Sequence, residues 1–187
     1  MDGLRFSLDS SLGRLARWLR LLGHDAAWQR GDGLEKALAR ARAEGRSLLT
    51  LSRGIGRTGV VPPLTGARTL SSTRPIEQLV EIAGVWPIFS TARPFTRCAD
   101  CNVELAAADP EWARARVPEF VARTQTSFRT CPTCNRIFWN ATHATAILRT
   151  LQDAARRANQ VLPPEAPENE GAGSDSSDPA PDGQAGR

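Results

Sequence analysis

Residues 4–23 read LRFSLDSSLGRLARWLRLLG and decide the fold of the first half of the chain. The first five of them have the length and apolar character of a short strand, which ends at Asp9. Ser10 or Ser11 is then placed to cap a helix, and Gly23 is placed to end it. One face of that helix is apolar, because its apolar residues recur at helical spacing: Leu12, Leu15, Ala16, Leu19 and Leu22.

The chain up to residue 90 continues to alternate between strand and helix patterns. Apolar runs of strand length occur at 26–28, 47–51, 60–61 and 69–71. Helical patterns occupy 33–44, opened by Asp32, and 76–83, which follows Pro75. This order of elements predicts an α/β layer with a mostly parallel sheet.

All four cysteines lie in the second half of the chain, as two Cys-x-x-Cys pairs: Cys98 with Cys101, and Cys131 with Cys134. Each pair predicts a tight turn that points two sulfur atoms at one place. Two such turns facing each other supply the four thiolates that tetrahedral Zn²⁺ prefers. We therefore expect a small ribbon around a structural zinc ion, in which the 29 residues between the pairs fold back as a hairpin or a helix.

Disulfide bonds and independent redox motifs also use Cys-x-x-Cys pairs, but a cytosolic setting and the duplicated pattern argue against both. Four sulfur ligands leave no open position, which argues against a catalytic zinc. His143 is expected to pack near the ribbon rather than bind the ion. Phe138 and Trp139, beside the second pair, are expected to support the ribbon by packing.

Two aspartates of the first half are candidate catalytic residues. Asp9 follows the first strand, and Asp32 begins a helix. The carboxyl ends of parallel strands share one edge of a sheet, and carboxylates gathered there hold Mg²⁺ or Mn²⁺ for phosphodiester hydrolysis. Such a site normally needs three or four carboxylates, and an aspartate after a strand is also a routine helix cap, so both interpretations stay open.

The net charge of +4 divides unevenly, because residues 163–187 hold six carboxylates against Arg187, a net of −5, and residues 1–162 carry +9. Such a basic body suggests a polyanionic partner such as RNA. Arginines 14, 17 and 20 leave the apolar stripe of the first helix, where they fit phosphate contacts or a solvated helix face. The candidate RNA contacts are Arg14, Arg17 and Arg53.

Four segments together resemble the Mut-seven C-terminal RNase family, in which a PIN-like domain is fused to a zinc ribbon. They are the opening segment 6–23, the segment 44–50, and the segments around the two cysteine pairs, 93–102 and 131–143. The resemblance extends in order over about residues 4–152. The opening segment and the ribbon together are specific, whereas either cysteine pair alone is not.

The resemblance implies a metal-dependent ribonuclease, with Asp9 and Asp32 at the first two acidic positions of the family. The chain departs from the family at the third. The family reads Leu-Leu-Thr-Arg-Asp-Arg, whereas residues 48–53 read Leu-Leu-Thr-Leu-Ser-Arg, so that Ser52 stands where a carboxylate is expected. A neutral hydroxyl does not supply the charge that draws a divalent ion such as Mg²⁺ or Mn²⁺.

Three functions therefore remain open. The first is a PIN-like ribonuclease that uses Asp9 and Asp32 with a divalent metal and an arginine-rich surface for RNA; Asp25 and Glu77 are the acids that could compensate for Ser52. The second is a catalytically weakened or inactive relative that binds RNA or a ribonucleoprotein. The third is a protein-interaction module on the same fold.

We expect a three-layer PIN-like domain over residues 1–90, a zinc ribbon with a trailing helix over 91–152, and a disordered acidic tail over 163–187. No stretch reaches about 18 uninterrupted apolar residues, so no membrane span is expected. Residues 1–6 lack a basic segment followed by an apolar one, so we expect no secretory signal and a cytoplasmic protein. No small-molecule cofactor is expected, because Gly54-Ile-Gly56 lacks the third glycine of a dinucleotide motif.

Overall fold

The structure is a computed structural model that describes residues 3–53, 66–139 and 142–164. Its larger sheet has four parallel strands: β1 (Arg5–Leu8), β2 (Asp25–Ala27), β3 (Ser47–Thr50) and β4 (Ala67–Thr69). They lie in the order β2-β1-β3-β4. The carboxyl ends of all four strands therefore share one edge of the sheet, as the sequence predicts.

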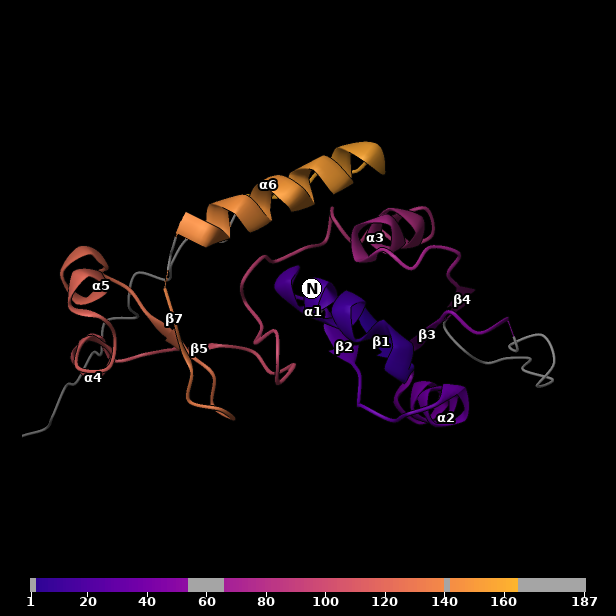
Figure 1. Cartoon of the computed structure of the whole chain (residues 1–187), viewed down its shortest axis with the longest axis horizontal. Coiled ribbons are helices and arrows are strands. Elements are labelled where there is room, and N and C mark those ends of the chain that lie inside the picture. Colours follow the sequence, from indigo (N-terminus) through magenta and orange to yellow (C-terminus); the bar gives the residue numbers. More distant parts are fainter. Residues whose placement is uncertain (1–2, 54–65, 140–141, 165–187) are drawn as a thin grey trace, which may run out of the picture.

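Helices cover both faces of this sheet (Figure 1). Helix α2 (Leu34–Glu44) lies on one face. Helix α1 (Gly13–Leu21), which is entered through a 3-10 turn (Ser10–Leu12), and helix α3 (Pro75–Ala83) lie on the other. The predicted three-layer α/β arrangement is confirmed.

Alternation along the strands assigns side chains to the two faces. In β3, Leu48 packs with the apolar side of α2, whereas Leu49 belongs to the larger core on the opposite face. In β1, Phe6 and Leu8 enter that larger core, and the hydroxyl of Ser7 donates to the carbonyl of Ala37 in α2 at 2.8 Å. All four residues of β3 are buried, as expected for a strand covered on both faces.

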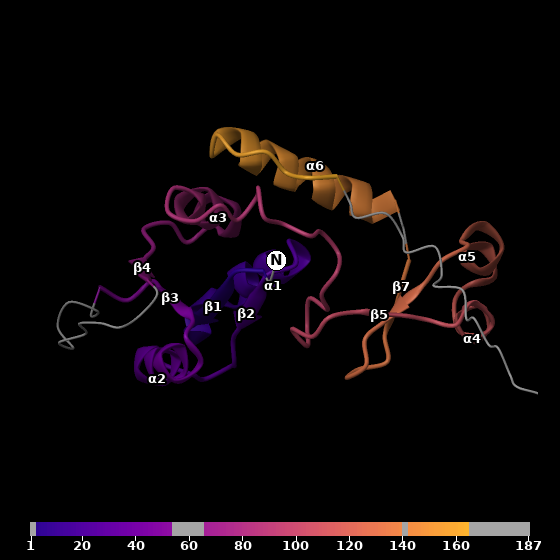
Figure 2. The same ribbon diagram turned by 180° about the vertical axis from the view of Figure 1, so that it is seen from behind.

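Helix α6 (Thr142–Arg157) follows the cysteine-rich segment and returns to the larger core (Figure 2). Its residues Leu151, Ala154 and Ala155 are buried in the same cluster as the α1 stripe. Gln160, just beyond it, donates to the carbonyls of Ala83 at 2.7 Å and Trp86 at 3.0 Å. The chain after the ribbon therefore contributes to the core of the parallel-sheet layer.

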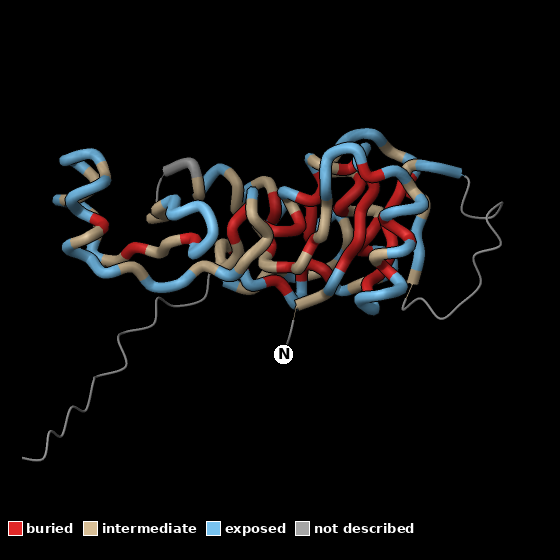
Figure 3. Tube along the Cα trace, turned by 90° about the horizontal axis from the view of Figure 1, so that it is seen from below, coloured by how far each residue is buried: buried red, intermediate tan, exposed pale blue. Residues whose placement is uncertain are grey.

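The second sheet is small and antiparallel. Its strands are β5 (Ala106–Ala107), β6 (Arg129–Thr130) and β7 (Ile137–Phe138), in that order. Between β5 and β6 the chain forms two short helices, α4 (Pro110–Arg114) and α5 (Glu119–Thr124). Figure 3 shows that buried residues concentrate around the parallel sheet and are sparse around the small one. A unit with so little apolar burial needs another source of stability, such as a metal.

Two details of the expected helix starts are wrong. The 3-10 turn before α1 is capped by Asp9, whose carboxylate accepts from the backbone N–H of Ser11 at 2.9 Å, so the serines are not the cap. Helix α2 begins after Gly33 without a side-chain cap, because the carboxylate of Asp32 is bound elsewhere. The strand expected at 60–61 and the tail from residue 165 lie outside the described residues.

Arg20, expected on a solvated or RNA-facing side of α1, is instead 5% exposed. Its guanidinium donates to the carbonyl of Ala26 at 3.0 and 2.8 Å, to that of Ala99 at 3.1 Å and to that of Asp100 at 2.9 Å. One side chain thus joins α1, the edge strand β2 and the turn of the first cysteine pair. Desolvation by burial lowers the pKa of Arg20, against the opposing effect of Asp100.

The same turn also closes the free edge of β2. The side-chain carbonyl of Asn102 accepts from the backbone N–H of Ala26 at 2.9 Å, and its amide donates to Asp25 at 2.6 Å. Gly23 makes room for the chain that leads to the turn, because it has a φ of +89° and a Cβ there would lie 2.4 Å from the carbonyl oxygen of Arg93. The two halves of the chain are therefore joined by specific polar contacts.

None of the helices in the described part of the chain is long and apolar enough to cross a membrane.

Replacing Arg20 by methionine tests how much these contacts stabilise the fold. The variant keeps an apolar stem but leaves three carbonyls without their donor, so we expect the free energy of unfolding to fall by about 3 kcal/mol, roughly 1 kcal/mol for each carbonyl. Arg17→Met on the same helix is the control, since Arg17 is 62% exposed and a surface ion pair contributes less than about 1 kcal/mol. Urea unfolding of zinc-loaded protein measures both; equal losses would contradict the assigned role of Arg20.

His24 predicts an acid-sensitive fold. It is fully buried, its Nε2–H donates to the carbonyl of Ile88 at 2.7 Å, and Nδ1 has no hydrogen-bond partner within the described residues. Burial lowers the pKa of His24, so below about pH 6.5 the unfolded chain takes up a proton that the folded chain refuses. Stability should therefore fall between pH 7 and pH 6, with a slope of up to about 1.4 kcal/mol per pH unit. His24→Gln should have a shallower slope in urea unfolding at the two pH values; an unchanged slope would exclude His24 as its source.

Candidate functional site

The four cysteines form a compact cluster. Their Sγ atoms all lie within 4.8 Å of one another, and none is in a disulfide. A tetrahedral zinc ion with Zn–S bonds of about 2.3 Å holds its sulfurs about 3.8 Å apart. The donor set and its size therefore fit a structural metal such as zinc, which the two Cys-x-x-Cys pairs would hold.

Both cysteine pairs make the same turn. The residues that follow them, Asn102 and Asn135, adopt left-handed backbone conformations with φ of 64° and 55°. Their N–H groups donate back to the carbonyls of Cys98 at 3.0 Å and Cys131 at 2.8 Å. Asparagine tolerates this conformation better than other residues with a Cβ, which explains why Asn follows each pair.

The cluster is electrostatically uneven. Burial and the neighbouring thiols raise the pKa of Cys101 to about 12. Burial opposes ionisation of Cys131 as well, but the backbone N–H groups of Cys134 and Thr133 lower the pKa of its thiol to about 7. Binding of a metal must therefore displace the proton of the Cys101 thiol, and zinc affinity should rise with pH.

At the carboxyl edge of the parallel sheet, Asp9 is buried to 6% exposure between two strands. One of its oxygens accepts from the backbone N–H and the hydroxyl of Ser11, and the other accepts from the hydroxyl of Thr50 at the end of β3. The same hydroxyl oxygen accepts from the backbone N–H of Ser52 at 2.9 Å. The ends of β1 and β3 are thus linked through Asp9 and Thr50.

Asp32 reaches the same edge with its main chain. Its carbonyl accepts from the N–H of Ser10 at 2.7 Å. Its carboxylate, however, pairs with Arg40 at 2.7 Å and with Lys36 at 3.9 Å. Arg40 also donates to the carbonyl of Leu8 at 3.0 Å. The fixed positive charge of Arg40 therefore lies beside the carboxylate of Asp32. It offsets the negative charge that would attract a divalent ion.

These residues do not fit the set of carboxylates that a divalent ion needs at this edge. Apart from the cysteines, no group of three or more His, Cys, Asp and Glu side chains in the described ranges is arranged to hold a metal ion. Ser52 is exposed and adds no charge. This edge therefore lacks the ligand set with which a divalent ion would support hydrolysis.

Of the two acids that could compensate for Ser52, Asp25 lies away from this edge and Glu77 is paired with an arginine. Asp25 lies at the start of β2, the opposite end of the strands, where Arg46 pairs with it at 2.7 Å. Burial alone would raise the pKa of Asp25, but the hydrogen bonds from Arg46 and Asn102 lower it. The hydrogen bond from Arg157 on α6 lowers the pKa of Glu77. Neither acid supplies the missing carboxylate.

The candidate RNA contacts are spread over different surfaces. Arg53 lines a cavity of 260 Å³ at the ends of β3 and β4, next to Ser52. Arg17 lines another cavity, and its guanidinium pairs with Asp100 at 3.1 Å. Arg14 is exposed on α1. The structure therefore places Arg53 near the candidate catalytic edge and Arg17 beside the cysteine turn.

Residues 4–151 match the family described as the Mut7-C RNAse domain, which is 148 of the 187 residues. The chain belongs to the Mut7-C RNase family. The resemblance found in the sequence is thereby confirmed, and membership implies a PIN-like ribonuclease domain with RNA as its substrate class. A search of curated proteins found no match, and a search of solved structures found none either.

Sequence reasoning missed two residues that define the edge of this Mut7-C domain. Thr50 was assigned to a strand, and only the parallel pairing of β1 with β3 brings its hydroxyl to Asp9. Arg40 is one of two arginines of α2, and no motif marks it as the partner of Asp32. The pairing of β1 with β3 could have indicated that Thr50 lies near Asp9. No comparable pattern indicates that Arg40 pairs with Asp32.

The cysteine cluster predicts one zinc ion per chain in freshly purified protein. Cys131→Ser removes the most easily ionised thiol and should reduce zinc to well below half an ion per chain, whereas Thr133→Ser in the same turn should retain it. Elemental analysis by mass spectrometry measures both. Wild-type protein with less than half a zinc per chain would contradict the assignment.

Proposed function

We propose that this chain is a PIN-like RNA-cleaving domain whose hydrolytic activity is weak. The observation that carries the proposal is the ion pair of Asp32 with Arg40 at 2.7 Å, with both side chains largely buried. Ser52 stands at the third acidic position. Among the described residues, Asp9 is therefore the one expected carboxylate that has no cationic partner. Mg²⁺ or Mn²⁺ is the proposed cofactor of the residual activity, and zinc is the proposed structural ion.

The residues of the edge have distinct tasks in this proposal. Ser11 and Thr50 hold the carboxylate of Asp9 in one orientation at the end of β1. Arg53, on the adjacent cavity, is placed to contact an RNA phosphate. A divalent ion would supply Lewis acidity and an activated water, and Asp9 is the carboxylate of this edge that would hold it. A single carboxylate would bind such an ion weakly.

A second function, binding of RNA or a ribonucleoprotein without cleavage, is supported by the way Arg40 is held. Its guanidinium donates to the hydroxyl of Ser7 at 3.0 Å and to the carbonyls of Leu8 at 3.0 Å and Ala27 at 3.4 Å, besides pairing with Asp32. So many acceptors fix the cation in place, and Asp32 is then not released for a metal. A protein-interaction role without RNA is the remaining alternative, and absence of RNA binding at low salt would favour it.

Restoring the missing carboxylate should raise cleavage. We expect wild-type protein to cleave single-stranded RNA slowly with Mn²⁺, and Ser52→Asp to be faster by about 10- to 100-fold, the range for gain or loss of one group that supports a metal. Ser52→Asn is the matched control, because it adds similar bulk without charge, and it should not be faster. Asp9→Asn should abolish cleavage. Initial rates on a labelled RNA measure all four proteins.

Two outcomes would contradict the proposal. If Asp9→Asn cleaves as fast as wild type, the catalytic edge is misassigned. If wild type is already as fast as Ser52→Asp, the edge has no shortage of carboxylates. Undetectable cleavage by wild type and by Ser52→Asp would favour the non-catalytic RNA-binding function.

A further inference from the structure

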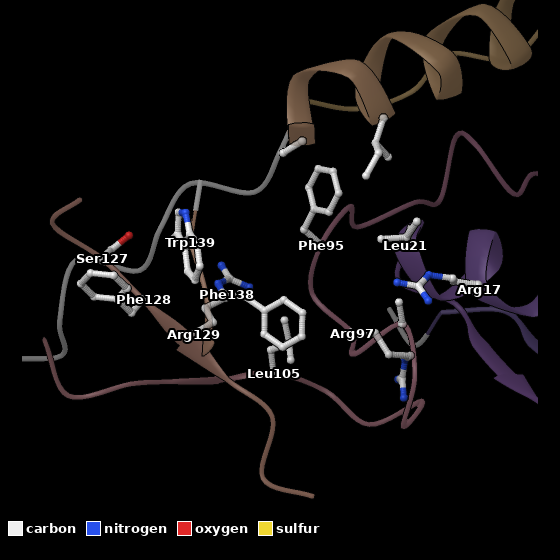
Figure 4. Close-up of a pocket in the computed structure, with 13 residues that line it drawn as sticks. Arg17, Leu21, Phe95, Arg97, Leu105, Ser127, Phe128, Arg129, Phe138 and Trp139 are labelled. Atoms are coloured by element: carbon white, nitrogen blue, oxygen red, sulfur yellow. The ribbon is translucent and has the colours of Figure 1, made fainter. Parts of the chain in front are cut away.

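A cavity of 220 Å³ lies where α1, the chain before the first cysteine pair, the small sheet and the start of α6 meet (Figure 4). Aromatic rings and arginines make up much of its wall: Phe95, Phe138, Trp139, Arg17, Arg97 and Arg129. The carboxyl edge with Asp9 lies at the other end of α1, a helix about 13 Å long at 1.5 Å per residue. The cavity is therefore separate from the candidate catalytic edge.

Of the four aromatic residues that line this cavity, only Phe128 is buried; the other three are not ordinary core residues. Phe138 and Trp139, which we expect to support the ribbon by packing, are both partly buried. Together with Phe95 they stand outside both buried apolar clusters found in the described part of the chain. Their rings are directed at the cavity from the small sheet and from the chain before Cys98 (Figure 4). Part of each of these three side chains is thus exposed beside the cavity.

Three arginines line the cavity, and one of them, Arg17, is paired with Asp100 at 3.1 Å. None of the cavity's 13 lining residues is acidic. Arg97 is engaged with Glu104 at 3.2 Å and with the carbonyl of Asn102 at 2.6 Å. The guanidinium of Arg129, by contrast, has no hydrogen-bond or ion-pair partner within the described ranges, and Arg129 lies directly opposite Phe138 in the β6–β7 pair. A cation without a counterion beside an aromatic ring suits a group that combines a flat base with a phosphate.

We propose that this cavity binds one unstacked base of single-stranded RNA, with Arg129 contacting an adjacent phosphate. The inference rests on the proposed function, since RNA is the substrate class of the family. The volume of the cavity is below the roughly 300–1,000 Å³ of sites for drug-sized ligands. A cavity of this size fits a single base better than a larger cofactor. Bases of a duplex are stacked and paired, so only a single strand presents a base to such a site.

The test measures RNA binding by the zinc-loaded full chain without added Mn²⁺. Its variants distinguish the stacking of a base on an aromatic ring from the apolar bulk of the side chain. Trp139→Leu keeps apolar bulk but removes the π-face, and should weaken binding of a labelled single-stranded RNA by about 5- to 100-fold, the range for one base stacked on one aromatic ring. Trp139→Phe keeps a ring and should retain most of the affinity. Phe120→Leu is the control, because Phe120 is an aromatic residue that is 71% exposed and does not line the cavity.

A second pair of variants tests the phosphate contact and does not depend on the folding of a tryptophan variant. Arg129→Ala should weaken binding more than Arg114→Ala, an exposed arginine of α4 outside the cavity, and should reduce the salt slope by about 1. Zinc content and the urea midpoint of each variant report whether it is folded. The same RNA in duplex form should bind more weakly to wild type.

Wild-type affinity in folded Trp139→Leu, equal losses in Arg129→Ala and Arg114→Ala, or equal affinity for duplex RNA would each overturn the inference. These results would leave the proposed function standing, because cleavage at the Asp9 edge is measured separately. Absence of RNA binding by wild type would overturn both. If the cavity binds a protein side chain instead of a base, all the cavity variants should bind RNA with the affinity of the wild type.

Discussion

The balance of charge at the carboxyl edge of the parallel sheet is the constraint on which the chemistry of this domain depends. Parallel pairing brings the carboxyl ends of β1, β2 and β3 together. Asp9, the main chain of Asp32 and Ser52, which follows β3, therefore lie along the same edge. Divalent ions are held by negative oxygens, and a cation already fixed by several acceptors repels them. Because Arg40 is bound to Asp32 and to the strand ends, the edge is closer to neutral than a metal site requires.

The cysteine cluster, in contrast, has a full set of ligands for a metal ion, because four sulfur donors face one another. The small sheet has little apolar core, and a metal held by the four cysteines would supply much of its folding energy. Arg20 and Asn102 then fasten the first cysteine turn to α1 and β2, and α6 carries the chain back to the larger core. The ribbon is thereby attached to the ribonuclease layer at a defined place, and the aromatic cavity forms along that junction.

The sequence predicted most elements of the fold and the cysteine cluster, because both depend on local patterns. The apolar stripe of α1 and the two Cys-x-x-Cys pairs can be recognised because the residues that define each of them are close together in the sequence. The role of Arg20 could not be foreseen, since an arginine that bonds distant carbonyls has the same local pattern as one in solvent. The same holds for Asp32, whose partner on α2 is set by the packing of that helix rather than by any motif. Ser52 was visible only through comparison with the family, and its effect on activity stays a prediction.

Direct titration of the edge with Mn²⁺ tests the shortage of carboxylates most simply. Electron paramagnetic resonance of free Mn²⁺ measures binding to zinc-loaded wild type and to Asp9→Asn. We predict binding to wild type with a dissociation constant of about 1 mM or weaker, the range of poorly charged sites, and its loss in Asp9→Asn. Micromolar binding that depends on Asp9 would show that the edge assembles a full set of ligands and would contradict the weakened site.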